Sequence, residues 1–309
     1  MKDYLTDIND KFPIRRTSEQ KKSFFEYVKA EAESVGLDAR IETLEKKHNN
    51  IIIGDIESAK AVYTAHYDTP ARSFVPNLML PLNPLLGTMY HIGIPLLLAL
   101  LSLGMAYGIS ALVGGGSTVL VVLYLVIYFG LFFGIMRCGD NKNNKNDNTS
   151  GVSTLLSLMS KNPKGVAYIL FDNEEKGLLG SKALLKKDKE FWENKLLINF
   201  DCVGNGENIV IVASKKAEKH QLFEKLTDTV KGNDAFNVGI FSQKGSSSNT
   251  DSKNFPCGIS VMACKKSKKG VLYTPYIHTV KDTVASIENI CFLAESFCNF
   301  SNCVLEETV

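Results

Sequence analysis

Acidic residues and histidines follow several short apolar runs in this 309-residue chain. Residues 61–65, 166–171 and 196–200 are such runs, and they lead into His66, Glu174 with Glu175, and Asp201. Short continuous apolar runs are typical of buried strands. In open α/β sheets, ligands gather beyond the carboxyl ends of the strands. Carboxylates and imidazoles brought to one sheet edge can bind divalent metal ions, so the sequence predicts a metalloenzyme.

The candidate residues are numerous enough to bind two ions. One bridging carboxylate, two further ligands per ion and one free carboxylate acting as general base would suffice. The candidates are His66, Asp68, Asp147, Glu174, Glu175, Asp201 and His278. Each has an ordinary alternative when taken alone, such as a helix cap for Asp147 or a structural role for a histidine. Their joint occurrence favours the metal site.

Two of these acidic residues are expected to assist the ligands. Adjacent residues cannot easily ligate in the same way, so one of Glu174 and Glu175 is expected to bind metal while the other transfers protons. Asp68 lies two residues after His66. A carboxylate in that position can accept the second N–H of a ligating imidazole and fix its tautomer.

Five segments hold these residues. In chain order they are His66-Tyr67-Asp68-Thr69, Asp147-Asn148-Thr149-Ser150-Gly151, Asp172-Asn173-Glu174-Glu175, Asn199-Phe200-Asp201 and His278-Thr279-Val280-Lys281-Asp282-Thr283. Their composition and order resemble the di-zinc aminopeptidase family, which includes the bacterial leucine aminopeptidases and aminopeptidase Y. The resemblance covers residues 40–304, apart from an apolar insert.

The resemblance implies a ligand set for two zinc ions. Asp147 would bridge both ions, His66 and Asp201 would complete one site, and Glu175 and His278 would complete the other. Cobalt or manganese would suit the same ligands.

The resemblance also implies an activity. The chain would be an aminopeptidase that hydrolyses N-terminal residues from peptides by means of a metal-bridged water. Glu174 would be the general base and Asp68 would orient His66. The segment at residues 249–255 departs from the family, because Ser252 stands where a histidine is usual. Substrate-pocket contacts there are therefore not transferable.

Two other functions stay open. A glutaminyl cyclase-like acyltransferase would use one zinc ion and form pyroglutamate. A non-catalytic member of the family would act as a membrane binding protein. Tyr273 and Tyr276 lie close to His278 and could shape the pocket, stabilise an oxyanion or simply pack around the loop.

The apolar insert predicts a transmembrane hairpin. Residues 85–113 and 118–136 lack Asp, Glu, Lys and Arg, and each run can supply the ~20 residues that cross a bilayer. Arg72 and Arg137 flank the two ends, which places the catalytic part in the cytoplasm by the positive-inside rule. We therefore expect a two-helix cell-membrane protein that contacts the bilayer through residues 85–136.

The remaining sequence predicts a single interrupted domain. Strand-like and helix-like segments alternate, which predicts an α/β fold with a mixed, mostly parallel sheet and helices on both faces. We also expect a capping box from Thr17 to Gln20, a polar linker over residues 140–148 and a helix over residues 217–231. Residues 1–83 and 137–309 would form the zinc-peptidase-like domain, and residues 84–136 the hairpin.

The net charge of +2 gives no sign of a nucleic-acid partner, and seven cysteines without CxxC pairs indicate reduced thiols. A Gly-x-x-x-Gly spacing at residues 104–108 leaves an oligomer open.

Overall fold

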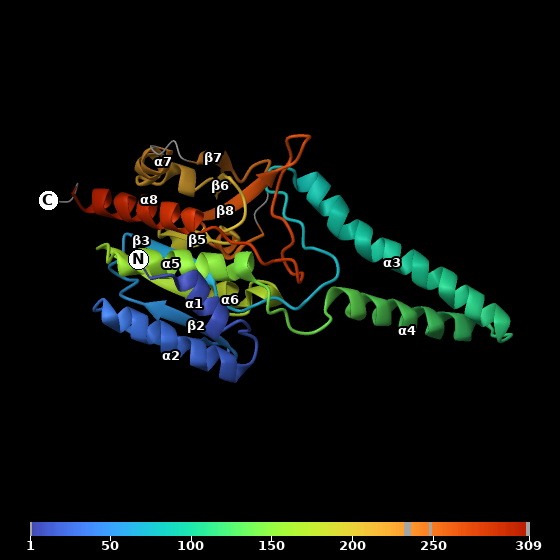
Figure 1. The fold of residues 1–309 in the computed structure, drawn as a ribbon. Coiled ribbons are helices and arrows are strands. Elements are labelled where there is room, and N and C mark those ends of the chain that lie inside the picture. Colours follow the sequence, from blue (N-terminus) through green and yellow to red (C-terminus); the bar gives the residue numbers. More distant parts are fainter. Residues whose placement is uncertain (1, 232–235, 247–248, 307–309) are drawn as a thin grey trace.

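The structure is a computed structural model that describes residues 2–231, 236–246 and 249–306 (Figure 1). The described residues form a nine-stranded sheet in the order β1-β2-β4-β3-β5-β8-β6-β7, with β9 paired to β8. The strands are β1 (Ala39–Leu44), β2 (His48–Ile53), β3 (Ala61–His66), β4 (Val166–Phe171), β5 (Leu196–Phe200), β6 (Asn208–Ala213), β7 (Asn237–Ser242), β8 (Gly258–Lys266) and β9 (Leu272–Tyr273). The central strands β4, β3, β5 and β8 are parallel, and antiparallel pairs lie on either side of them. The predicted mixed α/β fold is confirmed.

Helices cover both faces of this sheet. One face packs against α1 (Tyr4–Lys11), α2 (Ser18–Ser34), α5 (Gly151–Ser160), α7 (Phe223–Lys231) and α8 (Ile287–Glu306), and the other against α6 (Leu179–Lys187). In β2, Ile51 and Ile53 belong to the first core and Ile52 to the second. Because both faces are buried, the strands read as continuous apolar runs rather than alternating ones.

The structure differs from the sequence prediction in several elements. The helix expected over residues 217–231 is broken, because His220 is extended with φ −70° and ψ 138°. A short 3-10 turn (Ala217–Lys219) therefore precedes α7. Helix α1 and strands β7 and β9 were not predicted. The expected capping box of α2 is present, with Thr17 and Gln20 bonded reciprocally.

The segment at residues 140–148 is not the polar linker that its Asn and Lys content predicts. Asn141, Asn144 and Asn146 are buried. The Asn144 Nδ2 group donates to the Pro13 carbonyl at 2.6 Å, and Asn146 Oδ1 accepts from the Gly204 amide at 2.8 Å. These amide side chains satisfy buried backbone groups, so the segment is a fixed part of the domain.

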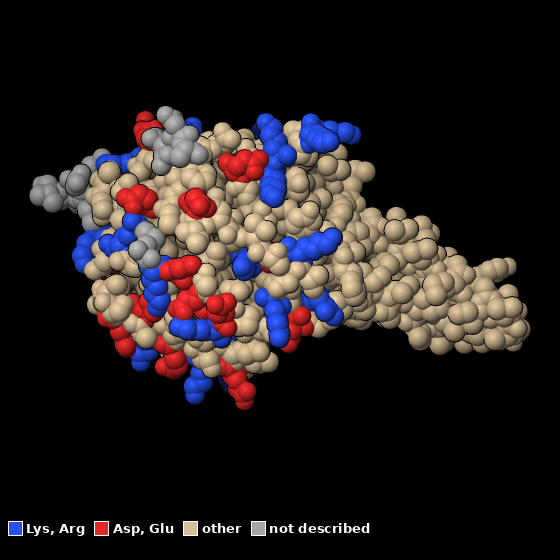
Figure 2. All heavy atoms as spheres, in the orientation of Figure 1, with Lys and Arg blue, Asp and Glu red and all other residues tan. Residues whose placement is uncertain are grey.

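The apolar insert forms two helices that project together from the body (Figure 1). They are α3 (Pro84–Leu112) and α4 (Ser117–Met136), and both are long and apolar enough to cross a membrane by length and composition. Figure 2 shows no Lys, Arg, Asp or Glu on the visible face of this projection, whereas charged side chains are spread over the body.

The two helices pack through one side of α3. Ser102, Ala106 and Ser110 recur at four-residue spacing and are buried. Gly104 and Gly108, the pair with Gly-x-x-x-Gly spacing, lie on the exposed side of α3 with nothing within 4 Å of an added Cβ. This glycine pair therefore does not form the contact with α4.

Candidate metal centre

The sheet brings the predicted site residues to one edge. His66 is the last residue of β3, which lies between β4 and β5 and is parallel to both. Asp201 directly follows β5, and a 3-10 turn (Glu174–Lys176) follows β4. Because parallel strands end at the same edge, residues more than 100 positions apart in the chain meet there.

One cluster forms around His66, which is buried. Its Nε2 atom lies 3.2 Å from Asp147 Oδ1 and 3.8 Å from Asp201 Oδ1. Its Nδ1 atom lies 3.1 Å from the Asp68 carbonyl oxygen. A proton on Nδ1 would be donated to that carbonyl, and Nε2 would then be free to bind a cation between the two carboxylates.

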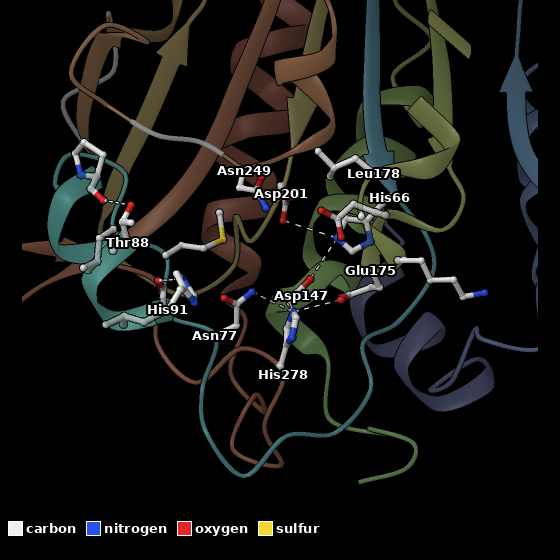
Figure 3. A pocket seen from close by; sticks show the side chains of 18 of the residues that line it. His66, Asn77, Thr88, His91, Asp147, Glu175, Leu178, Asp201, Asn249 and His278 are labelled. Carbon is white, nitrogen blue, oxygen red and sulfur yellow. Dashed lines mark hydrogen bonds and ion pairs between the residues drawn. The ribbon is translucent and has the colours of Figure 1, made fainter. Parts of the chain in front are cut away.

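A second cluster forms around His278. Its Nε2 atom lies 3.1 Å from Asp147 Oδ2 and 3.3 Å from Glu175 Oε2. The ligand-type atoms in each cluster all lie within 4.8 Å of one another. The two oxygens of Asp147 therefore face different histidines, which is the arrangement that a carboxylate bridging two ions requires. Figure 3 shows Asp147 between His66 and His278.

Asp68 supports the site differently from the sequence prediction. The closest approach of its carboxylate to His66 Nδ1 is 3.6 Å, longer than the contact from its own carbonyl. The carboxylate instead accepts the backbone N–H groups of Glu174 and Glu175, at 3.0 and 3.2 Å. Asp68 thus connects the end of β3 to the glutamate pair after β4.

Two residues without a predicted role hold Asp147. The carboxylate of Asp282 accepts the backbone N–H groups of Asn146 and Asp147, each at 3.0 Å. The side chain of Asn148 donates to the Phe200 carbonyl and accepts the Cys202 amide. Asp147 is therefore fixed both to the loop that contains His278 and to the end of β5.

The pKa values of the site residues indicate an excess of negative charge that bound cations would balance. Burial raises the pKa of Glu174 well above its usual value, and the carboxylates of Glu175 and Asp201 raise it further. Burial disfavours protonation of His66, but the Glu174, Asp147 and Asp201 carboxylates outweigh this effect and raise its pKa well above 6.5. The buried carboxylates thus favour the protonated forms of the groups beside them. Bound divalent cations would supply the compensating positive charge directly.

The residues present fit two zinc ions. Two imidazoles and three carboxylates form the donor set, and each group provides an atom to a cluster of suitable size. The buried Glu175 Oε1 atom has no hydrogen-bond partner among the described residues. A buried carboxylate oxygen without a partner, in a residue whose other oxygen lies beside His278, is suited to bind a metal ion.

A cavity of about 710 Å³ opens over this centre (Figure 3). Its lining includes the candidate ligands and Glu174 on one side, and residues 77–80 with the first turns of α3 on the other. Tyr273 and Tyr276 are not among the described residues that line it. Of the three roles that the sequence leaves open for these tyrosines, lining this cavity is therefore not supported. Cys202 is buried beside Asp201 and bears a free thiol.

Asp251 is a further acidic group near the centre without a predicted role. Its side chain is buried, with one oxygen accepting from the Ser181 hydroxyl and the other without a partner among the described residues. Burial raises its pKa to about 7. In the sequence, the segment that contains it is notable only for Ser252, and no role is predicted for Asp251.

Arg15 was also missed, because an arginine near a polar N-terminus is usually solvated. It is fully buried. Its guanidinium donates to the carbonyls of Tyr67 and Phe12, at 2.6 and 2.8 Å, and to Thr149 Oγ1 at 3.1 Å. Burial lowers its pKa to about 10, so it stays charged at neutral pH. Arg15 connects the end of β3 to the segment of Asp147.

Replacing Arg15 with methionine should destabilise the protein. The change removes the donors of two buried acceptors and one part-buried acceptor and takes away a cation near Asp68 and Asp147, at a cost of about 3 kcal/mol. Thermal unfolding in detergent should show a Tm lower by about 6–10 °C. Arg16→Met is the matched control, because Arg16 forms a partly exposed pair with Asp140 that contributes less than about 1 kcal/mol. Equal losses in the two variants would contradict this role.

The chain resembles known proteins in sequence and in fold. The pattern described as Peptidase family M28 matches residues 140–292. No curated protein matches the chain. A Zn-dependent exopeptidase from Parabacteroides distasonis shares 16% identity, with a TM-score of 0.60 over 97% of this chain and 95% of its own.

Two further solved structures have different activities in their names. The glutaminyl cyclase of Porphyromonas gingivalis is 15% identical, with a TM-score of 0.59 over 99% of this chain and 96% of its own. A leucine aminopeptidase precursor from Bacteroides thetaiotaomicron is 14% identical, with a TM-score of 0.56 over 97% and 94%. At these identities the likeness establishes the fold alone. The chain therefore has a zinc-exopeptidase-like α/β fold, matches the Peptidase family M28 pattern over residues 140–292, and has a candidate metal centre at the carboxyl edge of its sheet.

Proposed function

We propose that the chain is a zinc-dependent aminopeptidase. The observation that supports this most directly is the placement of Asp147, whose two oxygens face His66 and His278 separately. Each histidine has a second carboxylate beside it, from Asp201 in one cluster and Glu175 in the other. Two ions bound there would polarise the scissile carbonyl and activate a water molecule for attack.

Glu174 is the residue that we assign to proton transfer. It lies in a ligand-type cluster with His66 and Glu175 and lines the cavity. Its backbone is held by Asp68. Its carboxylate would take a proton from the attacking water and return it to the amine nitrogen as the peptide C–N bond breaks. Burial, which raises its pKa, suits a group that must hold that proton between the two steps.

The test combines metal analysis with substrate products. Purified full-length protein should bind two zinc ions per chain and release free N-terminal amino acids from aminoacyl amides and short peptides. A preparation that binds two zinc ions and leaves all peptide bonds intact would contradict the proposal.

Cyclisation of N-terminal glutamine is the second candidate. It is favoured by the fold shared with the glutaminyl cyclases of Porphyromonas gingivalis and Bacteroides thetaiotaomicron. A cyclase of this type would bind one zinc ion and convert a glutaminyl peptide to pyroglutamate with release of ammonia. The completeness of both ligand clusters favours the aminopeptidase.

We further propose that residues 84–136 anchor the enzyme in the cell membrane with the catalytic domain in the cytoplasm. The support is the length of α3 and α4, their lack of charge and the exposure of their apolar side chains. A helix of about 20 apolar residues spans the ~30 Å hydrocarbon layer.

Membrane placement predicts a definite labelling pattern. Val113→Cys, in the turn between the helices, should react with a membrane-impermeant maleimide on intact cells. Lys186→Cys, exposed on α6, should react only after permeabilisation. The native cysteines provide the background, measured on the unmodified chain. Labelling of Lys186→Cys in intact cells would contradict the orientation, and release of the chain by alkaline carbonate would contradict the anchor.

A further inference from the structure

The cavity over the metal centre has a second wall that comes from the base of the hairpin. Thr88, His91 and Ile92 belong to the first turns of α3 and line the same cavity as His66, Glu174 and Glu175. Figure 3 shows Thr88 and His91 on α3, across the cavity from the ligands. A substrate held at the metal centre would therefore contact the hairpin.

This wall is bonded to the catalytic loop. The Asn77 amide donates to the Ile277 carbonyl at 3.1 Å, and the Ser73 amide to the His278 carbonyl at 2.7 Å. Met79 forms an isolated bridge with Thr274. On α3 itself, the Tyr90 hydroxyl donates to the Pro76 carbonyl at 2.8 Å. The hairpin base and the loop of His278 are thus one structural unit, which fixes the distance between the site and the projecting helices.

The lengths of the two helices place this wall at the end of the hairpin nearest the body. Helix α3 has 29 residues and α4 has 20, so α3 is nine residues longer. The short turn between Leu112 and Ser117 holds their far ends together, and the excess therefore lies at the start of α3. The residues of α3 that line the cavity fall within that excess, between Pro84 and Ile92. Helix α4 at about 30 Å already matches the hydrocarbon layer.

The side chains of the excess turns suit the interface between water and lipid. Leu85 and Met89 are 74% and 62% exposed, so apolar surface begins at the cavity itself. Tyr90 and His91 stand beside them, and amphipathic rings are favoured at headgroup depth. With the hairpin inserted in a bilayer, the cavity would open at the membrane surface rather than into bulk water.

We infer that the preferred substrate is the N-terminal segment of a membrane-anchored peptide, presented to the metal centre at headgroup depth. This inference rests on the proposed aminopeptidase function and on the proposed anchor. Leu78, Met79 and Ile92 give the hairpin-side wall an apolar character that accepts apolar side chains near the cleaved bond. The enzyme would then prefer peptides whose N-terminus lies a short distance from their own membrane anchor.

The test uses the full chain with zinc, reconstituted in phosphatidylcholine vesicles. Two peptides begin with the same residues and end in the same apolar transmembrane helix, but differ in the spacer between them. A spacer of about six residues reaches at most ~20 Å, whereas a flexible Gly-Ser spacer of about 30 residues takes the N-terminus well away from the surface. At equal surface density, the short-spacer peptide should be cleaved about tenfold faster.

The outcomes separate the inference from the function on which it rests. Equal rates for the two spacers would overturn the inference, because both peptides are concentrated at the membrane to the same extent. A soluble peptide with the same N-terminal residues is assayed with the enzyme in detergent. Failure to cleave that peptide would count against the aminopeptidase proposal instead.

A matched pair of variants tests the wall. Thr88→Trp places a large ring in the cavity, whereas Met89→Trp places the same ring one residue further along α3, away from the cavity lining. Both positions are exposed and tolerate an interfacial tryptophan. Thr88→Trp should lower kcat/KM for the short-spacer peptide about tenfold with zinc content unchanged, and Met89→Trp should change it less than about twofold. Equal effects of the two variants would overturn the role of the wall.

Discussion

Replacing Glu174 with glutamine should give a folded protein that binds metal but has a very low kcat. Glutamine keeps the size of the side chain and loses the group that accepts a proton. General acid–base catalysis contributes about 10²- to 10⁴-fold, so kcat for an aminoacyl amide should fall by about three orders of magnitude. The zinc content should stay at the level of the unmodified chain, because Glu174 is assigned to proton transfer and not to either ligand set.

Two further variants make this result specific. Glu190→Gln removes an exposed carboxylate from the same domain. This variant should leave both activity and zinc content unchanged. Glu175→Gln changes the neighbouring residue, which we assign as a ligand of the His278 cluster, and should lower zinc content as well as rate. If Glu174→Gln loses zinc and Glu175→Gln keeps it, the two roles must be exchanged.

Replacing Asp147 with asparagine should abolish zinc binding at both sites. Each carboxylate oxygen faces one histidine, and the asparagine side chain would present a neutral amide nitrogen to one of them. Loss of a group that merely orients a ligand costs about 10- to 100-fold in metal affinity, so loss of the shared ligand should exceed ~100-fold. Activity should then fall below detection. Zinc titration against a competing chelator measures the affinity.

The unmodified chain provides the comparison for this variant. After treatment with a chelator it should lose activity and regain it when zinc is added back, whereas Asp147→Asn should not recover. Asp10→Asn, at an exposed acidic residue of α1, is the control for removal of one negative charge. An Asp147→Asn protein that binds two zinc ions with unchanged affinity would be incompatible with a bridging role.

The central strands and the ligand positions could be predicted from the sequence for a physical reason. Strands β3, β4 and β5 are buried on both faces, so each reads as a short apolar run, and a polar residue at its end stands out. The hairpin helices were predicted for the same kind of reason, because nothing in either run interrupts the apolar composition. In both cases the signal is local.

The elements that escaped prediction depend on contacts between distant segments. Strand β7 is only partly buried and lies outside the central part of the sheet, so its composition is mixed. The buried Asn141, Asn144 and Asn146 look like loop residues until their backbone partners are known. Arg15 and Asp282 hold the site by hydrogen bonds to segments more than 50 and 130 residues away, and such distances leave no periodic pattern.

The position of the hairpin in the chain has a consequence for biogenesis. His66 precedes the insertion, and the other four proposed ligands follow it. If α3 and α4 both cross the bilayer, the two parts of the ligand set meet in one compartment. A chain that inserts only one of the two helices would leave His66 on the opposite side from its partners. On the proposed function, a chain that inserts only one helix would therefore lack a complete metal centre and be inactive.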